Sequence, residues 1–329
     1  MLIHRRHFLR LGAGATALAT PTLGAIAQDF PTHPIRLVVP YPPGGIVDTL
    51  ARPWADKMKS LLGTVVVENM GGGGGELGAA AVARASADGY TILLGNSSVM
   101  VINPLASTRL HYDPIKHFDA VAMIGHVALA VTVHPSLPVN SVKELADYAK
   151  HSAGKLSYGT PGVGTLNHLT GEQFKLLAGA PDIVHVPYRG AGPAIADLLA
   201  GQIAMSVTAV NGQLLEFGRR GHLRILAVTS PRRLASAPDL PTVAEAGMPE
   251  LAAQATTWLL VPKGTPSAAI ARVSQATGTA LASPDLQQKY IASGVEPATD
   301  ASPEVAARQL GEEIAHWRPV VQRIGLRLD

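Results

Sequence analysis

The order of local patterns along this chain constrains its fold more than any other feature. Short runs of β-branched and other apolar residues alternate with stretches whose apolar residues recur every three or four positions. Strands that alternate with helices in this way form parallel sheets with crossover helices, so we predict an α/β protein. The strand-like runs cover residues 35–40, 64–68, 90–95, 121–133, 155–158, 182–186, 203–207, 223–229 and 256–261.

Local chemistry marks several helix starts between these runs. Residues 47–62 keep the spacing of one buried helical face, although Pro53 removes a backbone donor inside it. Capping-box spacing occurs twice, at residues 141–144 and 242–245, and indicates two more helix starts. A Ser or Thr precedes a Pro at residues 265–266, 283–284 and 302–303, which predicts three helices in the C-terminal stretch.

Residues 1–27 have the pattern of an export signal. Arg5 and Arg6, followed by Phe8 and Leu9, resemble a twin-arginine signal, and the small residues at positions 25 and 27 indicate cleavage before Gln28. The apolar stretch between them is broken by glycine and is shorter than the roughly 20 residues that span a bilayer. We therefore predict a periplasmic mature protein.

Charge and cysteine content narrow the possible partners. Three of the 27 Lys and Arg residues lie in residues 1–27, so the mature chain carries 24 basic and 24 acidic side chains. This balance gives no reason to expect a nucleic-acid or anionic-membrane partner. The chain of 329 residues has no cysteine, so apolar cores alone must hold it, usually as two domains at this length.

A stiff, glycine-containing loop connects the first strand to the first helix. It consists of Tyr41, Pro42, Pro43, Gly44 and Gly45. In an open parallel sheet, ligands lie beyond the carboxyl ends of the strands, where amides at helix N-termini attract anions. The glycines would let a ligand approach the backbone. Asp48, just beyond the loop, either caps the helix or accepts from a ligand amine, and a rigid turn without ligand is the alternative for the loop as a whole.

Two later loops also follow a predicted strand and contain glycine. The first comprises Thr160, Pro161, Gly162, Val163, Gly164 and Thr165, with Thr165 positioned to cap the next helix. The other comprises Tyr188, Arg189 and Gly190. The guanidinium of Arg189 suits a bidentate pair with a carboxylate, although a solvated surface arginine fits the same sequence.

An enzyme is the alternative from another class. Residues 73–78 contain a literal G-x-G-x-x-G, but Asn96, Ser97 and Ser98 stand where a dinucleotide fold has its ribose-binding acid. The sequence has no cysteine nucleophile, no G-x-S-x-G elbow and no H-E-x-x-H zinc motif. A nucleotide-dependent or hydrolytic periplasmic enzyme therefore remains the alternative function.

The loops, taken in order, resemble the Bug-type receptors of tripartite tricarboxylate transporters. The similarity covers essentially the whole mature chain. It rests on residues 34–45, 65–69, 88–98, 102–104, 112–122, 156–172, 182–203, 240–249 and 261–266.

This resemblance implies a periplasmic binding protein type II fold, with two Rossmann-like domains and a ligand cleft between them. Domain 1 would comprise residues 28–126 and 255–329, and domain 2 residues 127–254. The resemblance also implies a monomeric, non-catalytic receptor without metal or cofactor, which delivers a small organic anion to membrane permease subunits or to a sensor kinase.

The same resemblance assigns ligand contacts motif by motif. From the first domain they are Tyr41, Pro42, Pro43, Gly44, Gly45, Asp48, Asn96, Ser97 and Ser98. From the second they are Thr160, Pro161, Gly162, Val163, Gly164, Thr165, His168, Tyr188, Arg189, Gly190 and Thr208. Ile46 and Val47 stand where the family commonly has Gly and Thr, and Thr208 stands in place of a frequent Asp. The sequence therefore predicts the ligand class, a small carboxylate or amino acid, and not its identity.

Overall fold

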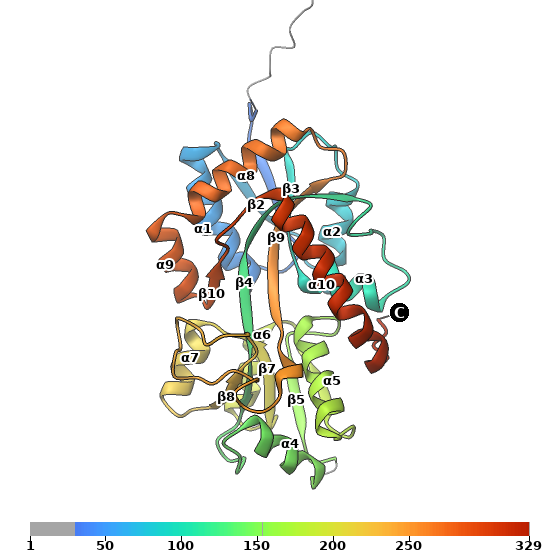
Figure 1. Ribbon diagram of the computed structural model, residues 1–329, viewed down its shortest axis with the longest axis vertical. Coiled ribbons are helices and arrows are strands. Elements are labelled where there is room, and N and C mark those ends of the chain that lie inside the picture. The colour runs from blue at the N-terminus through green and yellow to red at the C-terminus, as the bar shows by residue number, and fades with distance from the viewer. Residues whose placement is uncertain (1–29, 153, 329) are drawn as a thin grey trace, which may run out of the picture. The chain divides into compact units, whose positions relative to one another are not determined.

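The computed structural model describes residues 30–152 and 154–328 (Figure 1). The predicted export signal lies outside these residues. Pro31–Asp329 cluster as one compact unit. Within the described residues, no helix is both long enough and apolar enough to cross a membrane.

Ten strands among the described residues form the sheet. They are β1 (Ile35–Val39), β2 (Val65–Asn69), β3 (Thr91–Asn96), β4 (Phe118–Val133), β5 (Ser157–Thr160), β6 (Val184–Pro187), β7 (Met205–Ala209), β8 (Arg224–Val228), β9 (Gln254–Pro262) and β10 (Val295–Pro297). Their order is β2-β1-β3-β9-β4-β7-β5-β6, and both β8 and β10 also pair with β4. Strand β1 is parallel to β2 and β3, and β5 is parallel to β6 and β7. The nine predicted strands are all present, and the three-residue β10 was missed.

Strand β4 belongs to both halves of this sheet. Its residues from Phe118 to Ala128 pair with β9, and its residues from Leu129 onward pair with β7 and β8 (Figure 1). The strand run predicted at residues 121–133 lies within β4, and β4 pairs with strands of both groups. Strand β4 therefore joins the two groups of strands through backbone hydrogen bonds. The predicted domain boundaries within it stay a prediction.

Helices follow most of the strands. They are α1 (Ile46–Leu61), α2 (Glu76–Ala83), α3 (Asn103–Ala106), α4 (Val142–Lys150), α5 (Leu166–Ala178), α6 (Ala191–Leu199), α7 (Gly212–Arg219), α8 (Ser267–Leu281), α9 (Pro284–Ala292) and α10 (Pro303–Ile324). A single π-helical turn, Ser98–Ile102, follows β3, and short 3₁₀ turns occupy Gly73–Gly75 and Pro249–Leu251. Helix α1 continues through Pro53, because its apolar face is buried along most of its length.

The predicted helix starts have mixed outcomes. Ser141 caps α4 by accepting from the Glu144 amide, and the three C-terminal helices are present. The capping box at residues 242–245 also forms, with hydrogen bonds in both directions, but no helix follows it. The helix predicted there is wrong, because Gly247, with φ of 85°, and Pro249 end the turn before it can extend.

This topology positions the loops singled out by the sequence. The loop of residues 40–45 follows β1, and the Asn96–Ser98 segment ends the neighbouring strand β3. The loops after β5 and β6 likewise leave adjacent parallel strands. Each pair of loops therefore lies at one edge of its own group of strands.

Candidate ligand-binding site

The first loop (residues 40–45) is anchored by a buried acid. Asp48, in the first turn of α1, is 4% exposed. Its Oδ2 accepts from the Gly44 amide at 3.0 Å and from Arg52 Nε at 2.9 Å. Its Oδ1 accepts from Arg52 Nη2 at 2.9 Å and from Asn69 Nδ2 at 3.0 Å. A direct ligand contact would require Asp48 to leave these four donors, so the side chain serves as the anchor of the loop.

The charge of Asp48 is balanced within the protein. Burial alone would raise the pKa of this carboxyl, but its hydrogen bonds and the positive charge of Arg52 hold the pKa below its usual range. Residues 42–45 are exposed in front of it. The first loop thus presents backbone and proline rings, and little net charge, to a ligand.

Tyr41 connects the first loop to the end of β3. Its hydroxyl donates to Asn96 Oδ1 at 3.0 Å, and Asn69 Nδ2 donates to the Tyr41 carbonyl at 3.1 Å. Asn96 Oδ1 also accepts from the Val99 amide at 3.2 Å. Burial raises the pKa of Tyr41, so its hydroxyl stays protonated and remains a donor. Tyr41 and Asn96 therefore hold the two segments in register.

Adjacent serines after β3 have different surroundings. Ser97 is fully buried, donates to Glu313 Oε2 at 2.7 Å and accepts from the Thr256 amide at 2.8 Å. Ser98 Oγ accepts instead from the amide of Leu166, the first residue of α5, at 3.0 Å. Ser97 thus forms hydrogen bonds within the core, whereas Ser98 contacts the start of the helix that follows the second loop.

The second loop (residues 160–165) is shaped by its own hydroxyl groups. Thr165, the N-cap of α5, accepts from the His168 amide at 3.2 Å and donates to the Gly162 carbonyl at 2.8 Å. Thr160 Oγ1 accepts from the Gly162 amide at 3.3 Å. Gly164 has a φ of 77°, and an added Cβ there would lie 2.9 Å from Asn103 Oδ1. The loop therefore requires glycine at this position, as well as the capping threonine predicted from the sequence.

The third loop (residues 187–190) is joined to the second by backbone hydrogen bonds. The Tyr188 amide donates to the Thr160 carbonyl at 3.0 Å, and the Gly190 amide donates to the Pro161 carbonyl at 2.9 Å. The Tyr188 hydroxyl donates to Asp197 Oδ2 on α6 at 2.7 Å. Burial and this bond raise the pKa of Tyr188 to about 12. The two loops form one unit, on which Arg189 is exposed.

The remaining predicted contacts lie at the base of the second loop. His168 accepts from the Gly164 amide through Nδ1, at 3.4 Å. Asn167, which the sequence did not single out, donates to the Val207 carbonyl at 3.2 Å and so places the end of β7 beside the start of α5. Thr208, at that end of β7, is fully buried, and its hydroxyl has no hydrogen-bond partner among the described residues. Val163, by contrast, is 48% exposed at the tip of the loop.

These placements show which residues the sequence could not identify. Arg52 and Asn69 fix Asp48, and Asn167 fixes α5 against β7. The spacing of Asp48 and Arg52, four apart on a predicted helix, was a usable signal for their ion pair. No group of three or more His, Asp or Glu side chains in residues 30–152 and 154–328 is placed to hold a metal ion.

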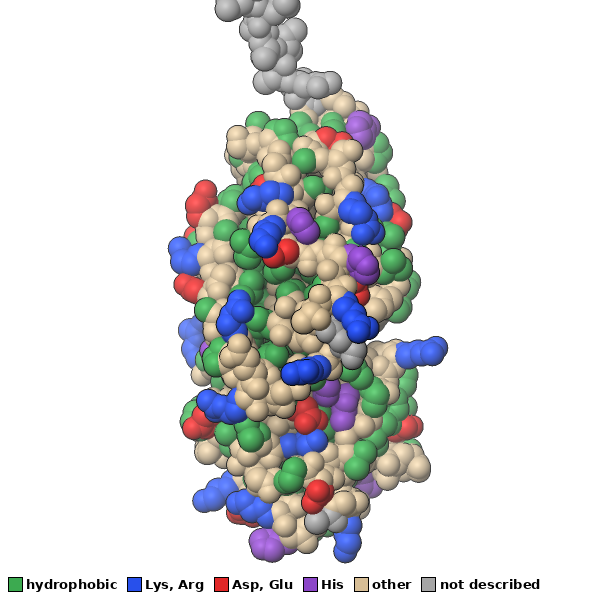
Figure 2. Space-filling view, turned by 90° about the vertical axis from the view of Figure 1, so that its right-hand side faces the viewer, with side chains coloured by type: hydrophobic (Ala, Val, Ile, Leu, Met, Phe, Trp, Pro, Cys, Tyr) green, Lys and Arg blue, Asp and Glu red, His purple; other side chains and the backbone are tan. Residues whose placement is uncertain are grey.

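Two open cavities lie elsewhere in the protein. One, of about 450 Å³, is lined by α7 and α9 residues including Leu215, Arg219 and Ile291. The other, of about 560 Å³, shares Leu215 and Arg219 and continues along residues 236–240. Neither is lined by the first or the second loop. Side chains of both signs are dispersed over the face in Figure 2 and are not gathered into one patch, as far as the described residues show.

The chain was compared with known protein families. Residues 50–326 match the tripartite tricarboxylate transporter family receptor. The chain belongs to this family. Among curated relatives, the protein BugT of Bordetella pertussis is 35% identical over 304 residues, which cover 92% of each chain.

Solved structures of family relatives agree closely with this fold. The periplasmic binding protein BugD is 32% identical with a TM-score of 0.82, covering 91% of this chain and 99% of BugD. The R. palustris protein Rpa4515, solved with adipate, is 33% identical with a TM-score of 0.83, covering 91% of this chain and 99% of that one. The predicted family and the two-domain periplasmic binding fold are thereby confirmed. This family consists of solute receptors and not of enzymes.

Proposed function

We propose that this chain is a periplasmic receptor that binds one small organic carboxylate between the first and the second loop. Membrane permease subunits or a sensor kinase would receive the loaded protein. The contact between Ser98 and Leu166 carries the proposal, because it brings the end of β3 to the N-terminus of α5. The positive end of a helix favours a carboxylate at that position.

The ligand class follows from the polar groups around this contact. The second loop lies at the positive end of α5, and Arg189 adds an exposed positive charge next to it. The acid nearest the first loop, Asp48, is neutralised by Arg52. This arrangement favours an anion, and the adipate bound to Rpa4515 is a small dicarboxylate of that kind.

The domain division is part of the same proposal. We place residues 28–126 and 255–329 in one lobe and residues 127–254 in the other. The chain then passes between the two proposed lobes within strands, once in β4 and once in β9. Strand β4 changes its pairing partners after Ala128, and β9 begins at Gln254. Paired strands bend without losing their hydrogen bonds, so closure of the lobes around a ligand would turn about β4 and β9.

Export to the periplasm has a simple test. Replacing both Arg5 and Arg6 by lysine preserves charge but removes the guanidinium pair of the proposed twin-arginine signal. Full-length variant protein should then stay in the cytoplasmic fraction, whereas the wild type appears in the periplasm. Unchanged export would show that a different route is used.

Ligand binding is tested by a thermal-shift screen of the purified chain against mono- and dicarboxylates, amino acids, NAD, NADP, FAD and ATP. A ligand at 100 times its Kd stabilises the folded protein by about 2.7 kcal/mol. We expect a carboxylate to raise the melting temperature and the nucleotides to leave it unchanged. A shift with a nucleotide and with no carboxylate would favour the enzyme alternative and refute the receptor.

A further inference from the structure

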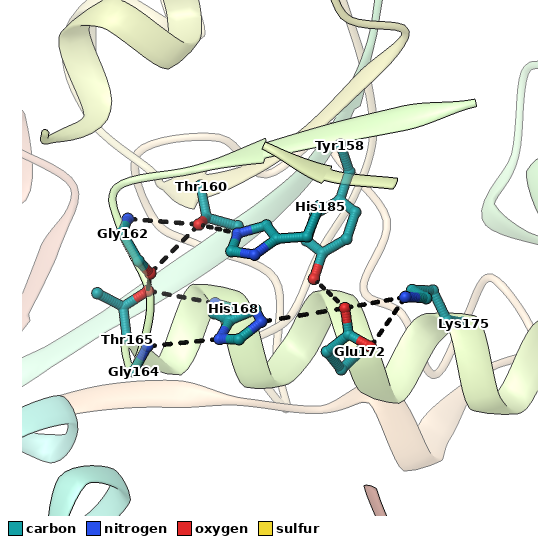
Figure 3. Close-up of polar contacts among 9 residues, drawn as sticks. All are labelled: Tyr158, Thr160, Gly162, Gly164, Thr165, His168, Glu172, Lys175 and His185. Atoms are coloured by element: carbon teal, nitrogen blue, oxygen red, sulfur yellow. Dashed lines mark hydrogen bonds and ion pairs between the residues drawn. The ribbon is translucent and has the colours of Figure 1, made fainter. Parts of the chain in front are cut away.

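A pair of stacked histidines lies behind the second loop (Figure 3). The rings of His168, on α5, and His185, on β6, are 4.0 Å apart and inclined by 13°. His185 also stacks on Tyr158 of β5, at 4.8 Å. His168 is 8% exposed, and His185 is half-buried. Three elements of the second lobe therefore meet at these two imidazoles.

Each imidazole contacts one end of the second loop. The Gly164 amide donates to His168 Nδ1 at 3.4 Å. His185 Nε2 lies 2.7 Å from Thr160 Oγ1, the same hydroxyl that accepts from the Gly162 amide. Loop shape is therefore tied to the two rings and not only to the loop's own threonines.

The charged groups around the pair are already engaged with one another. Glu172 Oε1 accepts from the Tyr158 hydroxyl at 2.6 Å, and Glu172 Oε2 lies 3.0 Å from Lys175 Nζ. His168 Nε2 is 4.0 Å from Glu172 Oε1. Because Lys175 offsets the charge of Glu172, the carboxylate compensates a charged His168 only in part.

The direction of the Gly164 hydrogen bond fixes the protonation state of His168. An imidazole nitrogen that accepts a hydrogen bond carries no proton, whereas both nitrogens of an imidazolium are donors. A protonated His168 would face the Gly164 amide with a second donor and would also repel a charged His185 above it. Protonation and the present loop shape are thus incompatible.

We propose that the neutral His168–His185 pair holds the second loop in its ligand-binding shape, and that protonation of the pair loosens the loop and weakens ligand binding. The inference rests on the proposed function for its effect on binding, but its effect on the loop stands without it. Both histidines act here as positioning residues, because their contacts are to the two ends of the loop.

The burial and the charges around the pair also favour the neutral state of both rings. Burial lowers the pKa of His168, with the charge of Lys175 adding to the effect and that of Glu172 opposing it. Burial and the neighbouring His168 lower the pKa of His185 to about 4. The folded loop therefore favours the neutral rings, and acidification acts against it.

The binding test compares three variants of the full chain by calorimetry with adipate at pH 7.5 and pH 5.0. His168→Asn keeps an acceptor near the Nδ1 position and cannot be protonated, and His222→Asn removes an exposed histidine elsewhere in the same lobe. His185→Phe keeps the stacked ring without charge. Below the pKa of His168, wild-type affinity should fall by up to about tenfold for each pH unit, as required when one proton must leave.

The loss between the two pH values should be smaller in His168→Asn and equal to that of the wild type in His222→Asn. Because the pKa of His185 is lowered to about 4, His185 stays mostly neutral at pH 5.0, and His185→Phe should keep most of the wild-type loss. Ionisation of adipate is common to all four proteins, so these differences report on the histidines. An equal loss in all four proteins would overturn the inference.

A second measurement decides the inference without any ligand. In ¹⁵N-labelled full-length protein, the Gly164 amide resonance should shift with the same midpoint as the His168 ring, and this shift should vanish in His168→Asn. A Gly164 resonance that ignores the titration of His168 would overturn the inference. Failure of every carboxylate to bind, with Gly164 still following His168, would refute the proposed function alone.

Discussion

The amide of Leu166 donates a hydrogen bond of 3.0 Å to Ser98 Oγ. Leu166 is the first residue of α5, and Ser98 lies two residues after the end of β3, so one hydroxyl connects the two groups of strands. Ser98 occupies an amide at the end of a helix where an anion would also be stabilised. We interpret this hydrogen bond as a contact that holds the segment after β3 against the start of α5.

Replacing Ser98 by alanine should weaken ligand binding. One hydrogen bond contributes about 0.5–1.5 kcal/mol, which corresponds to an affinity that is roughly 2- to 12-fold lower. Calorimetry with the best carboxylate from the screen measures this loss. The neighbouring Ser97→Ala is the matched control, because its hydroxyl donates to the buried Glu313.

Loss of that donor in Ser97→Ala should lower the free energy of unfolding by about 1–3 kcal/mol. Its effect on affinity should be smaller than that of Ser98→Ala. The reverse order, with Ser97 more important for binding, would contradict the assignment of the two serines.

Gly164→Ala should damage binding more than an equally strained glycine substitution elsewhere. Gly164 has a φ of 77°, and an added Cβ would lie 2.8 Å from Leu328 Cδ1. Gly221 has a φ of 72° with nothing within 4 Å of an added Cβ, so Gly221→Ala is the control. Each variant should lose about 1–2 kcal/mol of stability from the positive φ, measured by denaturant unfolding. Only Gly164→Ala should also lose affinity, and equal affinities would remove the second loop from the site.

Glu313→Gln should change how stability depends on pH. Glu313 is 9% exposed, and burial raises its pKa to about 7. Above the ordinary glutamate pKa of about 4.3, the unfolded chain loses this proton more readily than the folded protein, so Glu313 lowers stability as pH rises toward 7.

The variant should therefore gain stability relative to the wild type by on the order of 3 kcal/mol between pH 4 and pH 8. Urea unfolding at several pH values measures this difference. A pH-independent difference between the two proteins would contradict this, because it would mean that Glu313 has the same pKa in the folded and the unfolded chain.

Arg189→Ala should weaken carboxylate binding. Arg189 is exposed on the third loop, which is joined to the second loop through residues 160 and 161. A charge-assisted hydrogen bond contributes about 1.5–3 kcal/mol, so affinity should fall roughly 10- to 100-fold. Arg232→Ala, at another exposed position of the proposed second lobe, is the control. Equal affinity in the two variants would make Arg189 an ordinary surface residue.

The fold was largely predictable because each strand and helix carries its own local pattern. Most of the nine longer strands follow runs of β-branched and other apolar residues, whereas β10 has only Val295–Pro297 and exists through its pairing with β4. The box at residues 242–245 shows the limit of local signals. Its side chains form the expected hydrogen bonds, but the glycine and proline that follow prevent a helix.

The site was predictable only at the level of loops. The sequence placed the glycines and the capping Thr165 correctly, because turn and cap chemistry is local. It could not separate Ser97 from Ser98, since their partners, Glu313 and Leu166, lie far away in the chain. For the same reason, it assigned His185 no role, although that ring stacks on His168.

A crystal structure with the carboxylate that binds most tightly tests the central claim most directly. We predict carboxylate oxygens within hydrogen-bond distance of amides in residues 160–166, with the first loop facing them. A carboxylate bound instead in the cavity between α7 and α9, with the second loop empty, would contradict it.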